Sequence, residues 1–138
     1  MRDVVTTRQP LRVIVDSKLE TPLDAKILQG GPVLIAAAVN LENRAKLLMD
    51  AGAEVIVLPN SQGNVELRHL LVALAQRGIN EVQVEAGPAL CGALLRAGRV
   101  DELLLYQAPL LLGDSARPLF AGLGISFCPR PAGRSGWV

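Results

Sequence analysis

The part of this sequence best suited to chemistry is the run Val-Glu-Ala-Gly-Pro-Ala-Leu-Cys-Gly-Ala at residues 84–93. Its carboxylate, Glu85, ends a predicted strand. Gly87 makes a turn, and Pro88 takes the first helical position. An N–H at that position would have no partner within the helix, so its absence in proline costs nothing. The amides that open such a helix point outward at the positive end of its dipole and favour a phosphate. These amides belong to Ala89, Leu90 and Cys91, and small residues at 86, 87, 89, 92 and 93 let a ligand approach the backbone.

A tight turn with nothing bound explains the small residues of this run equally well, because short glycine loops are common. Glu85 is more informative, since a carboxylate after Val82 and Val84 lies at the sheet edge where open α/β sheets bind ligands. Its alternative role is a helix N-cap or a solvated turn residue. Asp16 and Ser17 end an earlier predicted strand in the same way, and for them a simple turn is the alternative.

The other reactive side chains carry weaker signals. His69 is the only histidine, lies in a predicted helix, and is interpreted as a surface residue rather than a catalyst. Cys91 could be a nucleophile at a positive helix end, but packing beside Leu90 and Leu94 is the favoured role. No histidine–serine–carboxylate triad can be assembled, so no catalytic residue is assigned. Cys91 and Cys128 match no metal or redox spacing, and no metal site is predicted.

The composition limits the class of protein. The 138 residues suffice for one domain with a sizeable core. Aromatic residues make up only 3 %, so the core must consist of Leu, Val, Ile and Ala, which suits an α/β sheet buried on both faces. The formal charge of +1 gives no argument for nucleic-acid or membrane partners, and no apolar run approaches the roughly 18 residues of a membrane span. Met1 is followed by charged residues rather than a signal peptide, so a reduced cytoplasmic setting is expected.

Strand-like and helix-like runs alternate along the chain. Predicted strands cover residues 11–15, 33–37, 54–58, 81–84 and 103–106. This alternation is typical of strand–helix–strand units, whose neighbouring strands are parallel and joined by right-handed crossovers. The fold class is therefore predicted to be α/β.

Three helices separate these strands. Asn40 is the predicted N-cap of a helix over residues 41–51, and Asn64 is the predicted N-cap of the next helix. A third helix follows Pro88. Each helix is expected to end at a glycine, which adopts the left-handed backbone conformation without steric cost; these glycines are Gly52, Gly78 and Gly98.

The two ends of the chain differ from its middle. Residues 1–9 show no strong pattern, and the stretch from Phe127 onward combines prolines, glycines and arginines with no strand or helix period. The predicted organisation is one nucleotide-binding domain over residues 1–126 and an irregular tail over residues 127–138.

Four blocks of residues stand in the order in which a known family has them. They are Arg-Gln-Pro-Leu-Arg-Val-Ile-Val-Asp-Ser at 8–17, Val-Glu-Ala-Gly-Pro-Ala-Leu at 84–90, Ala-Gly-Arg-Val-Asp-Glu-Leu at 97–103 and Ala-Pro-Leu-Leu-Leu-Gly at 108–113. Over about residues 8–124 the chain resembles the C-terminal reductase domain of the bifunctional riboflavin-biosynthesis deaminase/reductase. Ala86 stands where many relatives have glycine.

The resemblance implies a dihydrofolate-reductase-like fold, with a mostly parallel sheet between two layers of helices, and a possible homodimer is implied with it. The implied reaction is NADPH-dependent reduction of the ribosyl group of 5-amino-6-(5-phosphoribosylamino)uracil to a ribityl group. Glu85 would contact this pyrimidine ribosyl phosphate substrate, and Ser17 would touch NADPH. The residues implied to wrap the NADPH phosphates are Gly87, Pro88, Ala89, Leu90, Cys91, Gly92 and Ala93.

The chain departs from the family pattern at both ends. A stretch that precedes the Arg-Gln-Pro block in the family, with a lysine and an Asp-Asp-Pro segment, is missing, and so are the final strands and the zinc-binding deaminase domain. The expectation is therefore an incomplete reductase domain, truncated at both ends. Two alternatives to an active reductase stay open: an NADPH-binding fragment without turnover, and an inactive remnant of the domain.

Overall fold

The chain divides into two compact units, Met1–Glu81 (unit 1) and Val82–Val138 (unit 2). The computed structural model describes residues 9–106, 109, 113 and 116–124. The predicted tail over residues 127–138 lies outside the described residues, and the single domain over residues 1–126 stays a prediction. Each unit is described below by itself.

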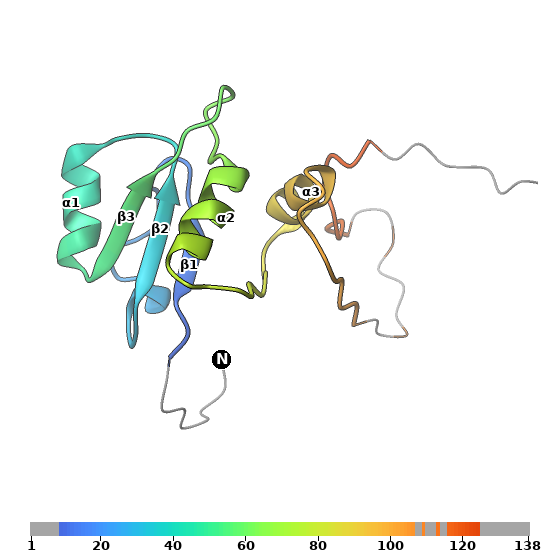
Figure 1. Cartoon of the computed structure of the whole chain (residues 1–138), viewed down its shortest axis with the longest axis horizontal. Coiled ribbons are helices and arrows are strands. Elements are labelled where there is room, and N and C mark those ends of the chain that lie inside the picture. Colours follow the sequence, from blue (N-terminus) through green and yellow to red (C-terminus); the bar gives the residue numbers. More distant parts are fainter. Residues whose placement is uncertain (1–8, 107–108, 110–112, 114–115, 125–138) are drawn as a thin grey trace, which may run out of the picture. The chain divides into compact units, whose positions relative to one another are not determined.

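A parallel three-stranded sheet in the order β1-β2-β3 forms the centre of unit 1 (Figure 1). Its strands are β1 (Arg12–Val15), β2 (Val33–Ala37) and β3 (Ala53–Val57). A 3₁₀ turn, η1 (Lys26–Leu28), lies between β1 and β2, and helix α1 (Glu42–Asp50) connects β2 to β3. The parallel pairing confirms the predicted α/β class.

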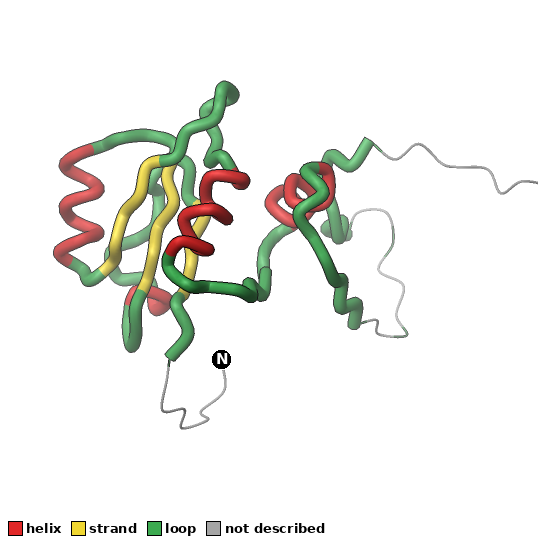
Figure 2. Tube along the Cα trace, viewed as in Figure 1, coloured by secondary structure: helices red, strands yellow, loops and turns green. Residues whose placement is uncertain are grey.

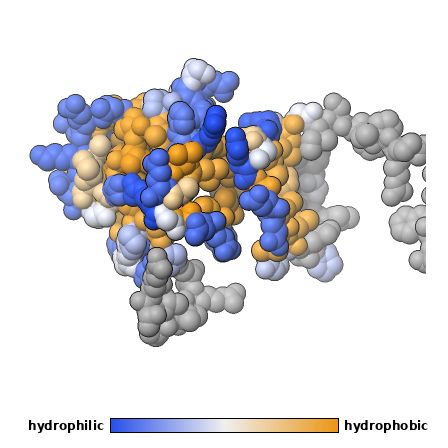
Figure 3. All heavy atoms as spheres, viewed as in Figure 1, coloured by the Kyte–Doolittle hydropathy of each residue, from blue (hydrophilic) through white to orange (hydrophobic). Residues whose placement is uncertain are grey.

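The central strand β2 divides the core of unit 1 into two clusters because its side chains alternate between the faces of the sheet. On one face Val33, Ile35 and Ala37 pack with residues of α1, and on the other Leu34 and Ala36 pack with residues of α2 (Leu67–Gln76). The two helices therefore cover opposite faces (Figure 2). Figure 3 shows apolar residues in the middle of unit 1, bordered by polar residues. Unit 1 thus has the predicted three layers of helix, sheet and helix.

The predicted N-caps of the first two helices are wrong. Leu41 is the N-cap of α1 and makes no side-chain capping bond. Glu66 is the N-cap of α2, where its carboxylate accepts a hydrogen bond from the amide of Arg68 at 3.2 Å. Asn64 instead belongs to a turn, because its amide donates to the side chain of Asn60 at 2.9 Å. A bridge between residues 59 and 65 follows β3 and delays the start of the helix.

Helix α3 (Pro88–Arg96) is the one helix among the described residues of unit 2, and it begins and ends where the sequence predicts. All three glycines that follow the helices have a positive φ, 94° at Gly52, 77° at Gly78 and 62° at Gly98. The helix ends are therefore set by the local conformation that glycine permits.

The strands predicted at residues 81–84 and 103–106 do not form, so this prediction is wrong. Both segments are irregular and exposed, and Leu104 and Tyr106 are 69 % and 92 % exposed. A strand exists only when its backbone groups pair with a neighbouring strand. Neither segment has such a neighbour among the described residues, although Val82, Val84 and Tyr106 are of the types that strands favour.

Helices of the described residues are all too short or too polar to cross a membrane.

Candidate functional site

The start of α3 has the local geometry that the sequence predicts. Gly87 is its N-cap with an extended backbone (φ −73°, ψ 171°), and Pro88 is the first helical residue. The amide of Cys91 donates to the carbonyl of Gly87 at 3.2 Å, so the prediction of a free amide at Cys91 is wrong. A helix closes its first hydrogen bond four residues back. The amides of Ala89 and Leu90 have no acceptor among the described residues, and they are the groups left to bind an anion.

A surface hollow of about 530 Å³ lies at this helix start, entirely within unit 2. It is open above Gly87, because a Cβ built on that residue would meet nothing within 4 Å. Most of its lining residues are exposed, so the hollow is shallow. They are Glu85, Ala86, Gly87, Pro88, Arg117, Pro118 and Leu119.

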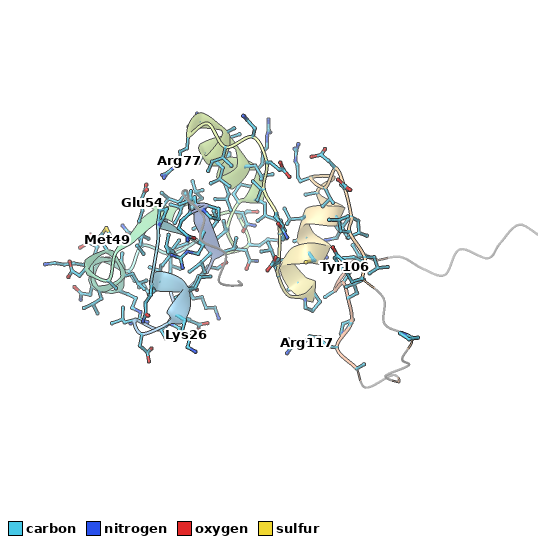
Figure 4. The ribbon with its side chains drawn as sticks, turned by 90° about the horizontal axis from the view of Figure 1, so that it is seen from below. Lys26, Met49, Glu54, Arg77, Tyr106 and Arg117 are labelled. Atoms are coloured by element: carbon cyan, nitrogen blue, oxygen red, sulfur yellow. The ribbon has the colours of Figure 1, made fainter. Side chains whose placement is uncertain are left out.

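Two charged side chains of opposite sign line the hollow. Glu85 is exposed, and one of its carboxylate oxygens accepts a hydrogen bond from the side-chain amide of Gln83 at 3.0 Å. Arg117, labelled in Figure 4, brings a cation to the same hollow. Sequence reasoning missed Arg117, because no spacing rule connects it with the run at residues 84–93. The arrangement can hold an anion beside Arg117 and a hydrogen-bond donor beside Glu85.

The later residues of the predicted phosphate run lie away from the hollow. Gly92 is buried against the backbone of Ala121, whose amide donates to the carbonyl of Pro88 at 2.9 Å. The Cys91 thiol is half-buried, with its sulfur 3.4 Å from the carbonyl oxygen of Ala86. Contact of these residues, and of Ala93, with a cofactor stays a prediction, while the small size of Gly92 already has a packing reason.

Asp16 and Ser17 lie in unit 1, at the carboxyl end of β1. The carboxylate of Asp16 accepts hydrogen bonds from the amide and the hydroxyl of Thr21, at 2.7 and 2.5 Å. Burial raises the pKa of Asp16, but these bonds and those of neighbouring amides outweigh it, so the pKa lies below its ordinary value of 3.8. The turn interpretation therefore accounts for Asp16.

Ser17 is half-buried and held by two hydrogen bonds. Its carbonyl accepts from the amide of Ala38 at 3.0 Å, and its hydroxyl oxygen accepts from the amide of Val65 at 3.3 Å. A hydroxyl has one proton and two lone pairs. The oxygen is used as an acceptor, and among the described residues the hydroxyl proton of Ser17 has no acceptor, so it can be donated to a further group.

His69 is exposed on α2, as interpreted from the sequence. Within the ranges that the structure describes, His, Cys, Asp and Glu side chains nowhere gather in threes that could hold a metal ion.

Comparison with known proteins identifies the chain's relatives. The model of the RibD C-terminal domain family matches residues 1–130. Riboflavin biosynthesis protein RibD of Escherichia coli is 39 % identical over 113 residues, which cover 81 % of this chain and 30 % of that protein. The RibD of Haemophilus influenzae is 41 % identical over 113 residues (81 % and 29 %), and that of Bacillus amyloliquefaciens is 37 % identical over 121 residues (85 % and 32 %).

The chain thus spans about a third of the length of these relatives. The matched region nevertheless covers most of the chain, including the run at residues 84–93 and the end of β1. The resemblance predicted from the four sequence blocks is confirmed. The chain belongs to the RibD C-terminal domain family.

Proposed function

We propose that this chain acts as an NADPH-dependent reductase domain of riboflavin biosynthesis, with 5-amino-6-(5-phosphoribosylamino)uracil as substrate and the ribitylamino compound as product. Membership of the RibD C-terminal domain family supports the pathway. The observation that carries the proposal is the hollow at the start of α3, which joins a helix N-terminus, a cation and a carboxylate. NADPH, when bound, supplies the hydride that reduces the sugar.

The described residues fit the phosphate part of a dinucleotide. Gly87 leaves its backbone open to a ligand, and the amides of Ala89 and Leu90 point out of the helix start without acceptors among the described residues. Arg117 adds a cation at the same hollow. A phosphate at an exposed helix start gains only about 0.3–1 kcal/mol from the helix dipole. The guanidinium of Arg117 is therefore expected to supply a larger share of the affinity.

Glu85 is assigned to the substrate rather than to the phosphates. A carboxylate repels a phosphate and accepts hydrogen bonds, so it suits the N–H and O–H donors of a pyrimidine or a sugar. We assign Ser17 to NADPH, to which it donates its hydroxyl proton. A homodimer is part of the same proposal on the ground of the family resemblance alone, and the cytoplasmic location expected from the sequence is proposed with it.

Cofactor binding without turnover is the second candidate function. It is favoured by the exposure of the hollow, since all its described lining residues except the partly buried Pro88 are exposed. Closing an active site expels water, which strengthens the electrostatic interactions inside it and prevents side reactions. A hollow this open suits binding better than chemistry.

Titration of the purified chain with NADPH, followed by nicotinamide fluorescence, tests both candidates. Gly87→Asp places a negative charge at the helix start, whereas Gly87→Asn has nearly the same shape and no charge. We expect Gly87→Asp to bind NADPH at least about tenfold more weakly than Gly87→Asn, since a repelled phosphate loses more than 1.4 kcal/mol. If the two variants bound NADPH with equal affinity, the phosphates of the cofactor would have to bind at another place.

Loss of nicotinamide absorbance on addition of substrate then separates the candidates. Turnover supports the reductase, and binding of NADPH without turnover supports the second candidate. Failure of the unsubstituted chain to bind NADPH rejects both.

A further inference from the structure

The turn that follows β1, residues 16–21, contains a backbone conformation that its sequence does not favour. Leu19 has a φ of 58° and is the one residue other than glycine with a positive φ among the described residues. This left-handed conformation is unfavourable for a residue with a Cβ. The side chain of Leu19 is only 2 % exposed and packs in the same cluster as Ala45 and Leu48 of α1. Contacts outside the turn must therefore hold it in place.

Arg44 on α1 supplies such contacts. Its Nε donates to the carbonyl of Leu19 at 3.1 Å, and its Nη2 donates to the carbonyl of Thr21 at 2.6 Å. One rigid guanidinium thus binds two carbonyls on either side of Glu20, a geometry that a lysine cannot reproduce. Asp16 binds the amide of Thr21 from within the turn, so the end of the turn is held from both directions.

Ser17 lies inside the same turn and is fixed with it. Its hydroxyl oxygen accepts from Val65, a residue that packs on the α2 face of the sheet, while Leu19 packs on the α1 face. The turn therefore spans both faces at the carboxyl end of β1. Ser17 and Leu19 are two residues apart in this turn, so a shift of Leu19 is expected to strain the hydrogen bond between Ser17 and Val65.

We infer that Arg44 is a positioning residue: it clamps the carbonyls of Leu19 and Thr21 and thereby keeps the Ser17 hydroxyl bonded to Val65, with its proton directed to a ligand. The inference rests on the proposed function in that it takes this ligand to be NADPH. Arg44 itself is not assigned any contact with the cofactor.

Amide hydrogen exchange tests the clamp without any ligand. Arg44→Met removes both donors, and Lys46→Met removes a cation from an exposed position of the same helix. In Arg44→Met the amides of Val65 and Ala38 should exchange about tenfold faster, as expected for weakening bonds of this kind. The amide of Leu58, which donates to Ala37 at 2.8 Å, is the internal reference and should not change. Equal acceleration at Leu58, or none at Val65, overturns the inference.

NADPH affinity then tests the coupling to Ser17. Arg44→Met should weaken NADPH binding by about fivefold or more in the unsubstituted chain and should have no further effect in a Ser17→Ala background. Arg44→Lys, which keeps one donor group, should recover part of the loss. If Arg44→Met weakens NADPH binding as much in the Ser17→Ala background as in the unsubstituted chain, the inference is wrong. If the unsubstituted chain binds no NADPH, the proposed function fails, and the exchange experiment still decides whether Arg44 positions Ser17.

Discussion

Gly92 lies so close to Ala121 that a Cβ on the glycine would collide with the carbonyl oxygen of Ala121. The amide of Ala121 also donates to the carbonyl of Pro88, and Arg96 donates to the carbonyl of Gly122. Ala121 and Gly122 are thereby held against α3 within unit 2. Since Arg117 lies four residues before Ala121, the contact between Gly92 and Ala121 helps to bring a cation to the start of the helix.

Substitution of Gly92 by alanine should therefore destabilise unit 2. In an open helix the change would gain about 1 kcal/mol of helix propensity. Here the collision with a backbone carbonyl costs about 1–3 kcal/mol, so the net effect should be a loss of stability of up to about 2 kcal/mol. Hydrogen exchange measures this loss of stability, and the amide of Ala121 should exchange faster in Gly92→Ala. Gly87→Ala is the control, because its Cβ meets nothing and its φ is negative; unchanged exchange in Gly92→Ala would contradict the packing argument.

At Leu19, substitution by glycine should destabilise the chain less than substitution by alanine, which is the reverse of the usual order. Leu19→Ala removes a side chain from the core and should cost about 2–5 kcal/mol. Leu19→Gly removes the same side chain but also relieves the left-handed conformation, so it should be less destabilising than Leu19→Ala by about 1 kcal/mol. Urea unfolding of both variants measures the difference. A more stable alanine variant would mean that the turn relaxes to an ordinary backbone conformation.

Asp16 should contribute stability that is lost in acid. Its pKa is lowered in the folded chain, so the ionised carboxylate stabilises the fold above the ordinary value of 3.8, and this stability disappears as the pH falls through the lower folded-state pKa. Asp16→Asn should be less stable than the unsubstituted chain by about 1–2 kcal/mol at neutral pH. The difference in free energy of unfolding between the two proteins, measured with urea, should become smaller below pH 3.8. If the difference in stability did not depend on pH, it would come from the shape of the side chain rather than from its charge.

The ion pair between Glu54 of β3 and Arg77 after α2 (Figure 4) should contribute little to the free energy of unfolding. The guanidinium meets both carboxylate oxygens, and the contact with Arg77 lowers the pKa of Glu54. Both side chains are largely solvated, at 54 % and 34 % exposure, so water and salt screen the attraction. A double-mutant cycle with Glu54→Gln and Arg77→Met should give a coupling of about 0.2–1 kcal/mol that declines in high salt. A coupling unaffected by salt would contradict this estimate.

Local signals in the sequence predicted the scaffold of unit 1 closely. The apolar run at residues 33–37 is strand β2 as predicted, and the strands on either side differ from their predicted bounds by one residue. The start of α3 at Pro88 and the left-handed glycines after the helices were also predicted, because they depend on the backbone preferences of single residues. The predicted N-caps at Asn40 and Asn64 failed: α1 begins after Leu41, which makes no capping bond, and α2 begins after Glu66, because Asn64 is part of the preceding turn with Asn60.

By itself, then, the sequence determined the α/β class, the helix start with an adjacent carboxylate, and the family. It could not decide whether segments 81–84 and 103–106 become strands, since pairing depends on a neighbouring strand rather than on the segment itself. Only the tertiary structure brought Arg117 to the hollow beside Gly87, and Arg44 to the turn that holds Ser17. Periodicity describes residues a few positions apart, whereas these contacts join residues far apart in the chain, where only the packing of whole elements sets the distance.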